Sequence, residues 1–259
     1  MNNCKNIETV NVKRYKSGIS EIIQDIVIVE KLLHIYVNGK HFAALLYTPG
    51  DEGNLVVGFL FCQGVITEIG DVKQMEFRDE NLVMVLIGKE ASLKYGEIMA
   101  ATAGCGGGSI RVSLLGKENI AAVESSYTVA HERISANMKS FNGESTLFKE
   151  TGGVHSCALY FEEKRLVLKE DIGRHNAFDK VIGEALQSGI MFEDKLMYTT
   201  GRVSSDIMIK AIRGGIPFVV SHSAPTNNAI KLAGAANIAL VGFVRGDRMN
   251  VYSGFERVK

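Results

Sequence analysis

One cysteine of this chain lies in a run of very small residues. The stretch Ala100–Gly108 has the sequence AATAGCGGG, in which Cys105 is followed directly by three glycines. Because no bulky side chains surround this thiol, we expect it to be accessible and its backbone to have unusual conformational freedom. Such a setting suits sulfur chemistry, in which a thiolate takes a sulfur atom from one partner and presents it to another. A glycine-rich turn that contains a small cysteine by chance would have the same pattern, and the residues alone leave both interpretations open.

The other three cysteines are weaker candidates for chemistry. Cys62 lies in an apolar run with helical spacing and Cys157 in an expected strand, so we expect both in the core. Cys4 lies in a polar stretch near the start and has no partner at short spacing. With no CxxC pair, no signal-peptide pattern and no apolar run near the roughly 20 residues that span a bilayer, we expect a soluble cytoplasmic protein with free thiols and no membrane contact.

Three polar segments follow expected strands and could bind an anion. In the segment Lys169–Lys180 (KEDIGRHNAFDK), Arg174 and His175 would add positive charge to a helix N-terminus, although Asp171 could equally cap a solvated first turn. In Gly242–Arg248 (GFVRGDR), two arginines flank a glycine and could clamp a phosphate, or they could belong to a charged turn. Ser221–Thr226 (SHSAPT) could line the same pocket or cap the next helix.

The charge distribution points to the same part of the chain. The 29 basic and 29 acidic residues of the 259-residue chain cancel, which removes the simplest case for a nucleic-acid-binding protein. Residues 200–259 contain eight Lys or Arg and three Asp or Glu, a net of +5, so the remainder carries −5. Glycine is also more frequent than usual, because 27 of the 259 residues are glycine and the average glycine content of proteins is about 7%. We therefore expect an anionic ligand near the C-terminal quarter.

Hydrophobic patterning predicts two regions of different character. Residues 1–115 are expected to form a β-rich region with one helix between Leu55 and Gly64, a hairpin at Asn38-Gly39 and the Cys105 loop at its end. Residues 116–259 alternate between strands and helices, with a boundary near residues 100–125. A βαβαβ order over residues 196–243 predicts an α/β domain whose sheet is mostly parallel. The sequence lacks GxSxG, HExxH, a P-loop and zinc-ligand spacing, so we expect no bound metal.

Several segments together resemble one family. The chain resembles the FdhD/NarQ family over nearly its whole length, and the matching segments follow one another in the order that they have in the family. The occurrence of DIGRHNA together with SAPT is the most specific part of the resemblance. The matching segments are Thr48–Ile66, Thr151–Leu159 (TGGVHSCAL), Lys169–Gly183, Gly201–Asp206 (GRVSSD), Gly215–Thr226 (GIPFVVSHSAPT) and Gly242–Ser253 (GFVRGDRMNVYS).

The resemblance implies a sulfur carrier of the sulfurtransferase type that formate dehydrogenase requires for activity. Such a protein takes sulfur from a cysteine desulfurase as a persulfide. It passes the sulfur to the molybdenum cofactor, bis(molybdopterin guanine dinucleotide), before that cofactor is inserted. The cofactor is thus a bound substrate, and no tightly held cofactor of the protein's own is expected. The family also implies a homodimer and a cytidine-deaminase-like fold for residues 116–259, without the zinc motif of deaminases.

The resemblance also assigns roles to individual residues. Cys105 matches the first cysteine of the family's CGxCG loop and would hold the persulfide. Gly108 stands where many members have the second loop cysteine, so sulfur exchange between two thiols inside this loop is impossible here. The cofactor-binding segment of the family matches Phe243, Val244, Arg245, Gly246, Asp247 and Arg248.

Two other functions remain open from the sequence. The protein could bind and deliver the guanylated cofactor without carrying sulfur, in which case Cys105 would be dispensable and Arg245 and Arg248 would not. A deaminase-like zinc hydrolase follows from fold analogy alone, and the scattered histidines and cysteines disfavour it.

Overall fold

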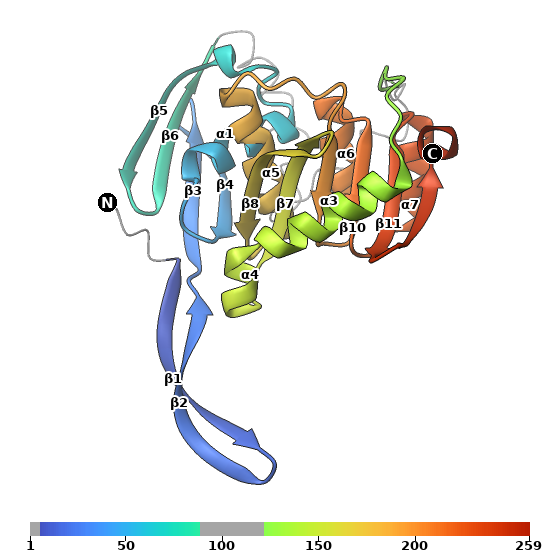
Figure 1. The fold of residues 1–259 in the computed structure, drawn as a ribbon. Coiled ribbons are helices and arrows are strands. Elements are labelled where there is room, and N and C mark those ends of the chain that lie inside the picture. The colour runs from blue at the N-terminus through green and yellow to red at the C-terminus, as the bar shows by residue number, and fades with distance from the viewer. Residues whose placement is uncertain (1–5, 89–121) are drawn as a thin grey trace.

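A six-stranded sheet forms the centre of the larger part of the molecule (Figure 1). The structure is a computed structural model that describes residues 6–88 and 122–259. The strand order is β12-β11-β10-β9-β7-β8, and only the pairs β9–β10 and β10–β11 are parallel. The α/β class and the βαβαβ order are confirmed, but the sheet is more mixed than the mostly parallel one expected. The strands are β7 (His155–Phe161), β8 (Lys164–Asp171), β9 (Leu196–Thr199), β10 (Phe218–Ser221), β11 (Ala239–Arg245) and β12 (Arg248–Ser253).

Helices cover both faces of this sheet, and alternation along the strands decides which side chain meets which layer. Cys157, Leu159 and Met197 face one core together with α5, α6 and α7. The residues next to them in the strands, such as Ala158 and Tyr160, point to the opposite face and pack in a second core against α3. The result is a three-layer α/β/α unit. The helices are α3 (His131–Glu144), α4 (Thr146–Thr151), α5 (Arg174–Gln187), α6 (Ser205–Gly214) and α7 (Asn227–Ala235), and the short 3-10 helix η3 (Phe255–Arg257) lies near the C-terminus.

The N-terminal region adds a four-stranded sheet of order β4-β3-β6-β5 and one helix, as expected. The Asn38-Gly39 turn is confirmed, with positive φ at both residues, which a two-residue hairpin of this kind requires. Helix α1 ends where Gly64 adopts a left-handed conformation, also as predicted. The elements are β3 (Lys31–Val37), β4 (Lys40–Tyr47), α1 (Glu52–Gln63), η1 (Ile69–Asp71), β5 (Val72–Asp79) and β6 (Leu82–Ile87).

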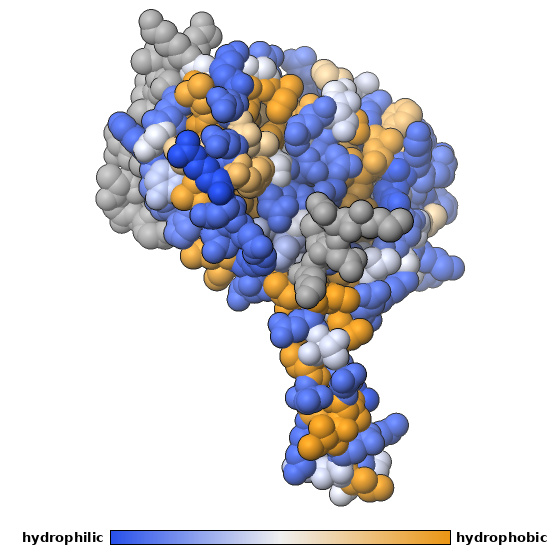
Figure 2. Space-filling view, turned by 90° about the vertical axis from the view of Figure 1, so that its left-hand side faces the viewer, coloured by the Kyte–Doolittle hydropathy of each residue, from blue (hydrophilic) through white to orange (hydrophobic). Residues whose placement is uncertain are grey.

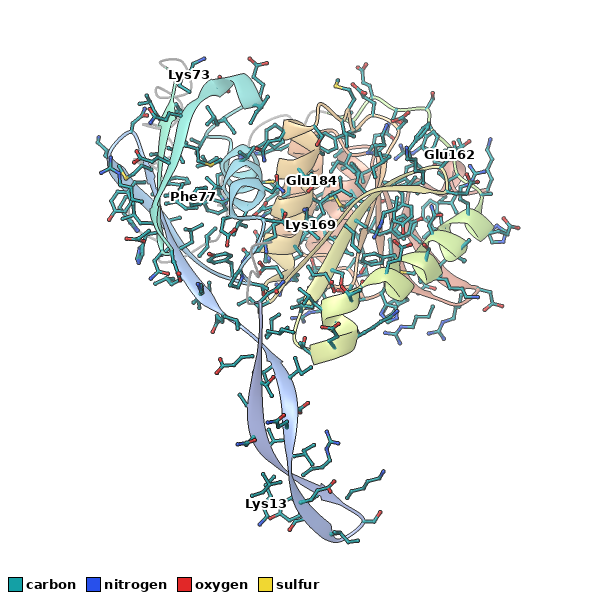
Figure 3. All side chains as sticks on the ribbon, turned by 60° about the vertical axis from the view of Figure 1, so that its left-hand side comes forward. Lys13, Lys73, Phe77, Glu162, Lys169 and Glu184 are labelled. Carbon is teal, nitrogen blue, oxygen red and sulfur yellow. The ribbon has the colours of Figure 1, made fainter. Side chains whose placement is uncertain are left out.

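Helices α1 and α5 join the two regions through an unusually close crossing. A Cβ atom built on Gly58 would lie 1.8 Å from the backbone oxygen of Asp179, and one on Gly183 would lie 1.9 Å from that of Asn54. Only hydrogen at these two positions lets the backbones approach so closely. Lys169 lies beside this crossing, paired with Glu184 and with Asp51 at 2.7 Å (Figure 3). The two regions therefore pack as one body at this contact.

A two-stranded ribbon projects from this body (Figure 1). It consists of β1 (Ile7–Lys16) and β2 (Ile19–Ile28), joined by a turn with positive φ at Ser17 and Gly18. Both strands lie in the region that the sequence predicts to be β-rich, although no pattern predicts β1 itself. We call this ribbon, Ile7–Ile28, the arm.

Two expectations concern residues 89–121, which lie outside the described part. They are the domain boundary near residues 100–125 and the position of the Cys105 loop. Among the described helices, none is both long and apolar enough to cross a membrane.

Candidate functional site

One edge of the six-stranded sheet collects the segments that the sequence singled out. Strands β8, β9, β10 and β11 all end at this edge of the sheet. Strand β7 begins there, because it runs antiparallel to β8 and β9. Backbone bonds fix the loops to one another: His222 N–H donates to Thr199 O at 3.0 Å, and Phe243 N–H donates to Ser223 O at 3.1 Å. The edge is thus a rigid platform built from residues that are far apart in sequence, where ligands of open α/β sheets commonly bind.

A cavity of about 410 Å³ opens at this edge, between the strand ends and helices α3 and α4. It is large enough for part of a nucleotide-sized ligand. Of the segment Ser221–Thr226, His222 lines this cavity, to which none of residues 242–248 contributes, and the Thr226 side chain caps α7 by accepting the Ala229 N–H at 3.3 Å. The lining residues are Asn142, Ser145, Phe148, Gly152, Gly153, Val154, His155, Ile172, Thr200 and His222.

Basic groups dominate the electrostatics of this edge. Burial and the charge of Arg174 lower the pKa of His155, and burial and the charge of Arg245 lower the pKa of His222. Arg174 packs its side chain against Gly201, where an added Cβ would lie 2.8 Å from the Arg174 Cβ. Its Nε is buried and has no hydrogen-bond partner within residues 6–88 and 122–259. An unpaired donor close to the His155 imidazole is an arrangement that an anionic ligand would satisfy.

Thr200 links the two strands at His155. The Thr200 hydroxyl accepts the Ser156 backbone N–H at 3.0 Å and lies 3.3 Å from His155 Nδ1. A neutral imidazole has one N–H donor and one nitrogen acceptor, so His155, which lines the cavity, carries both kinds of group.

A second cavity extends the site towards the C-terminal segment. It measures about 490 Å³ and lies between α3 and the β11–β12 turn, with Gly246 and Asp247 in its wall. Asn142 lines both cavities, so the two adjoin along α3. A ligand longer than one nucleotide could follow α3 from His155 to the turn.

The expected cofactor-binding segment, Phe243–Arg248, forms the end of β11, its turn and the first residue of β12. Val244 is buried, and Phe243 is half-buried with a φ of 53°. Arg245 is exposed, and its guanidinium lies 5.9 Å from the centre of the Phe243 ring. Arg248 pairs with Arg245 in the strand register and lines a third cavity of about 440 Å³, which shares His131 and Asp247 with the second. The two arginines are thus neighbours at one tip, while Val244 belongs to the core.

Asp171 of the segment Lys169–Lys180 lies in the interior and not in a solvated first turn. It is fully buried, accepts the backbone N–H of Thr48 at 3.1 Å and pairs with Lys180 at 2.8 Å. Lys180 also donates to Thr48 O, and Asn176 to Leu46 O. These members of the DIGRHNAFDK segment therefore clamp the N-terminal region onto α5. Ile172 of the same segment lines the cavity, and Arg174 and His175 are half-buried near His155.

Three comparisons with known proteins agree with this arrangement. The model of the FdhD/NarQ family matches residues 28–259. The chain belongs to the FdhD/NarQ family. It is 36% identical to the sulfur carrier protein FdhD of Listeria innocua over 252 residues, which cover 95% of this chain and 97% of that one. The FdhD of Bacillus subtilis is 36% identical over 253 residues, covering 96% of both chains.

A solved structure of the same kind matches the fold. It is the crystal structure of a protein from Desulfotalea psychrophila that is assigned as a formate dehydrogenase accessory protein. The two superpose with a TM-score of 0.81 at 26% identity, over 98% of this chain and 99% of the other. The architecture described above is thus shared with an FdhD-type protein.

The structure describes two of the four cysteines of the chain and shows how accessible their thiols are. Cys62 and Cys157 are both fully buried, as expected from the sequence. Burial raises the pKa of Cys157 to about 12 and that of Cys62 well above its usual value. Neither thiol is available as a nucleophile at neutral pH. Cys105, the expected persulfide carrier, lies outside the described residues, as does Cys4.

Some residues of the site were not found from the sequence. Asn142 lies near the end of α3, and α4, which was not predicted, supplies Phe148 to the cavity wall. Thr200 directly follows a predicted strand, a position that could have suggested it. Within residues 6–88 and 122–259, no group of three or more His, Cys, Asp and Glu could hold a metal ion.

We predict that His175 makes folding sensitive to acid. Burial, together with the charges of Lys210 and Arg174, lowers the pKa of His175 to about 3. The unfolded chain takes up this proton near pH 6.5 and the folded one does not, so stability is complete above pH 7 and falls as the pH drops below 6.5. Between pH 7 and pH 5 we expect His175→Gln to lose about 2 kcal/mol less unfolding free energy than the wild type. Urea unfolding at both pH values measures this, and equal losses in the two proteins would contradict it.

Proposed function

We propose that this protein is a sulfur carrier for the maturation of formate dehydrogenase and that Cys105 carries the sulfur as a persulfide. Membership of the FdhD/NarQ family, whose relatives are named sulfur carrier proteins, is the observation that carries the proposal. The inaccessibility of Cys62 and Cys157 supports the choice of thiol. Cys105 stands among small residues, which suits a thiol that must meet two large partners in turn.

The chemistry begins with a cysteine desulfurase that bears a persulfide. The Cys105 thiolate attacks the terminal sulfur, a new sulfur–sulfur bond forms on Cys105, and the desulfurase thiolate leaves. In the second step the terminal sulfur passes to the metal centre of the substrate, the guanylated molybdenum cofactor. Cys105 departs as a thiolate, and the metal supplies the two electrons that convert a zero-valent sulfur into sulfide. One thiol is sufficient for both steps, so Gly108 in place of a second cysteine is no obstacle.

The basic edge of the sheet is the proposed binding place for that substrate. Bis(molybdopterin guanine dinucleotide) is long and carries several phosphates, which matches two adjoining cavities along α3. Arg174, His155 and His222 suit one anionic group, and Arg245 suits another at the β11–β12 tip. The residues present therefore fit a guanylated, phosphorylated ligand.

The basic edge needs no thiol, so a protein that only binds and delivers the cofactor is the second candidate. Under that alternative, the cavity residues would be essential and Cys105 would not. Complementation of a carrier-deficient strain with Cys105→Ala and with Arg245→Ala separates the two functions.

We predict that Arg174→Met weakens the binding of a guanine nucleotide. With GDP as the probe for one end of the cofactor, the loss of one charged hydrogen-bond donor should raise Kd about 10- to 100-fold. Isothermal titration calorimetry measures this. Arg78→Met on β5, in the N-terminal sheet, is the matched control and should bind GDP like the wild type. Equal affinities for Arg174→Met and the control would contradict the placement of the ligand.

A further inference from the structure

Helix α4 forms part of the wall of the 410 Å³ cavity, although none of its own residues is buried. Most of the residues that line the cavity lie between residues 142 and 155, the segment that contains α4. The helix has only six residues, and Phe148, which lines the cavity, is 46% exposed. A helix this short is not stable in water without contacts to other elements. Contacts outside α4 must therefore hold it in place.

The residue that would ordinarily cap α4 has another hydrogen-bond partner. The N-cap is Ser145, a residue type that commonly accepts a backbone N–H of the first helical turn. Here its side chain makes no such bond. The Ser145 hydroxyl instead donates to the backbone oxygen of Phe141, in the last turn of α3, at 3.0 Å. The first backbone N–H groups of α4 therefore need an acceptor from another element.

Glu170 of β8 supplies that acceptor. Its Oε2 accepts the Leu147 N–H and its Oε1 accepts the Phe148 N–H, both at 3.0 Å. The buried Ser156 hydroxyl donates to Oε1 at 3.2 Å, and Ser156 of β7 faces Glu170 in the strand register. A negative charge at a helix N-terminus also interacts favourably with the helix dipole. The carboxylate thus joins the central sheet to the first turn of α4.

Helix α4 also contacts the base of the arm (Figure 1). Hydrophobic residues gather where the arm meets the body (Figure 2), and a Cβ built on Gly153 would lie 3.0 Å from Ile28 Cγ2. Hydrophobic contacts are non-directional, so they press α4 and the arm together without selecting one orientation. The two hydrogen bonds to Glu170 are directional. They set the position of α4 relative to the sheet edge.

We propose that Glu170 is a positioning residue for cofactor binding, because its carboxylate holds α4 in the place that gives the cavity its binding shape. The inference rests on the proposed function, since the ligand is an anionic part of the guanylated cofactor. Glu170 is not among the residues that line the cavity. It acts through Phe148 and through residues 152–155, which lead from α4 into β7. Loss of the carboxylate is therefore expected to weaken ligand binding through the shape of the wall.

Glu170→Gln tests the proposal with GDP as the probe. An amide has one acceptor oxygen and presents N–H groups on its other side, so one of the two bonds to α4 is lost. We expect isothermal titration calorimetry to show a Kd about 10-fold higher than that of the wild type.

The matched control is Asp71→Asn, which removes a similar cap far from the cavity. Asp71 Oδ2 accepts the Thr67 N–H at 2.7 Å and the Glu68 N–H at 3.4 Å, in the N-terminal region. If Glu170 only contributed to overall stability, both variants would bind GDP like the wild type. Equal Kd values for Glu170→Gln and Asp71→Asn would therefore overturn the proposal.

Hydrogen exchange tests the position of α4 without any ligand. The Leu147 and Phe148 amides should exchange at least about 10-fold faster in Glu170→Gln than in the wild type, whereas Asp71→Asn should leave them unchanged. Unchanged exchange in β7 and β9 shows that Glu170→Gln is still folded. Unchanged exchange of the two α4 amides would overturn the proposal whatever the GDP result. A wild type that binds no GDP would instead overturn the proposed binding place, and the function of Glu170 in binding with it.

Discussion

Replacing Cys105 by alanine is expected to abolish the ability of this protein to restore formate dehydrogenase activity in a carrier-deficient strain. The reason is chemical: sulfur transfer needs a thiolate, and neither of the two cysteines that the structure describes can take the place of Cys105. Cys62 and Cys157 are fully buried and their pKa values are raised, so neither is ionised or accessible at neutral pH. We expect activity to fall to the level of the empty vector.

The matched control is Cys4→Ser, which removes the other cysteine outside the described residues. This variant should complement like the wild type, and immunoblots should show equal amounts of all three proteins. Full complementation by Cys105→Ala would contradict the carrier function and favour the binding-and-delivery alternative. Arg245→Ala would then be expected to fail where Cys105→Ala succeeds.

The second large effect concerns the crossing of α1 and α5. Gly183→Ala is expected to destabilise the protein by about 3 kcal/mol or more, in the range of severe overpacking. A Cβ at this position would lie 1.9 Å from the Asn54 backbone oxygen, so the two helices must separate. Separation also strains the contacts of Asp171 and Lys180 with Thr48, where a buried ion pair would lose partners.

The control is a helical glycine with free space around it. A Cβ on Gly234 of α7 would meet no atom within 4 Å, so Gly234→Ala should be neutral or stabilise by up to about 1 kcal/mol. Urea unfolding monitored by circular dichroism measures both variants. Similar stability of Gly183→Ala and Gly234→Ala would show that the crossing is not as tight as described.

Local signals in the sequence predicted much of the fold. The Asn38-Gly39 turn and the Gly64 helix end depend on positive φ, which the residue types themselves reveal. Buried strands such as Phe218–Ser221 are short apolar runs with helices between them, so the βαβαβ order followed from hydrophobicity. Strand β1 escaped prediction because it alternates weakly and is exposed on an arm, where no core imposes a pattern.

The site was less predictable because its contacts are long-range. Asp171 belongs to a polar segment that suggests a pocket, yet its partner Thr48 lies 123 residues away and draws it into the interior. His155 and Thr200 are 45 residues apart, and only the sheet brings them together. The family resemblance pointed to segments that meet at this edge of the sheet, whereas which side chain of each segment faces the cavity depends on packing.

Sulfur transfer to Cys105 is measured most directly by the mass of the Cys105 peptide after reaction with a cysteine desulfurase. The purified protein is incubated with the desulfurase and free cysteine, then digested without reductant and analysed by mass spectrometry. We expect one additional sulfur atom on the Cys105 peptide, removed by dithiothreitol and absent from the Cys105→Ala protein. A Cys105→Ala protein that acquires as much sulfur as the wild type would contradict it.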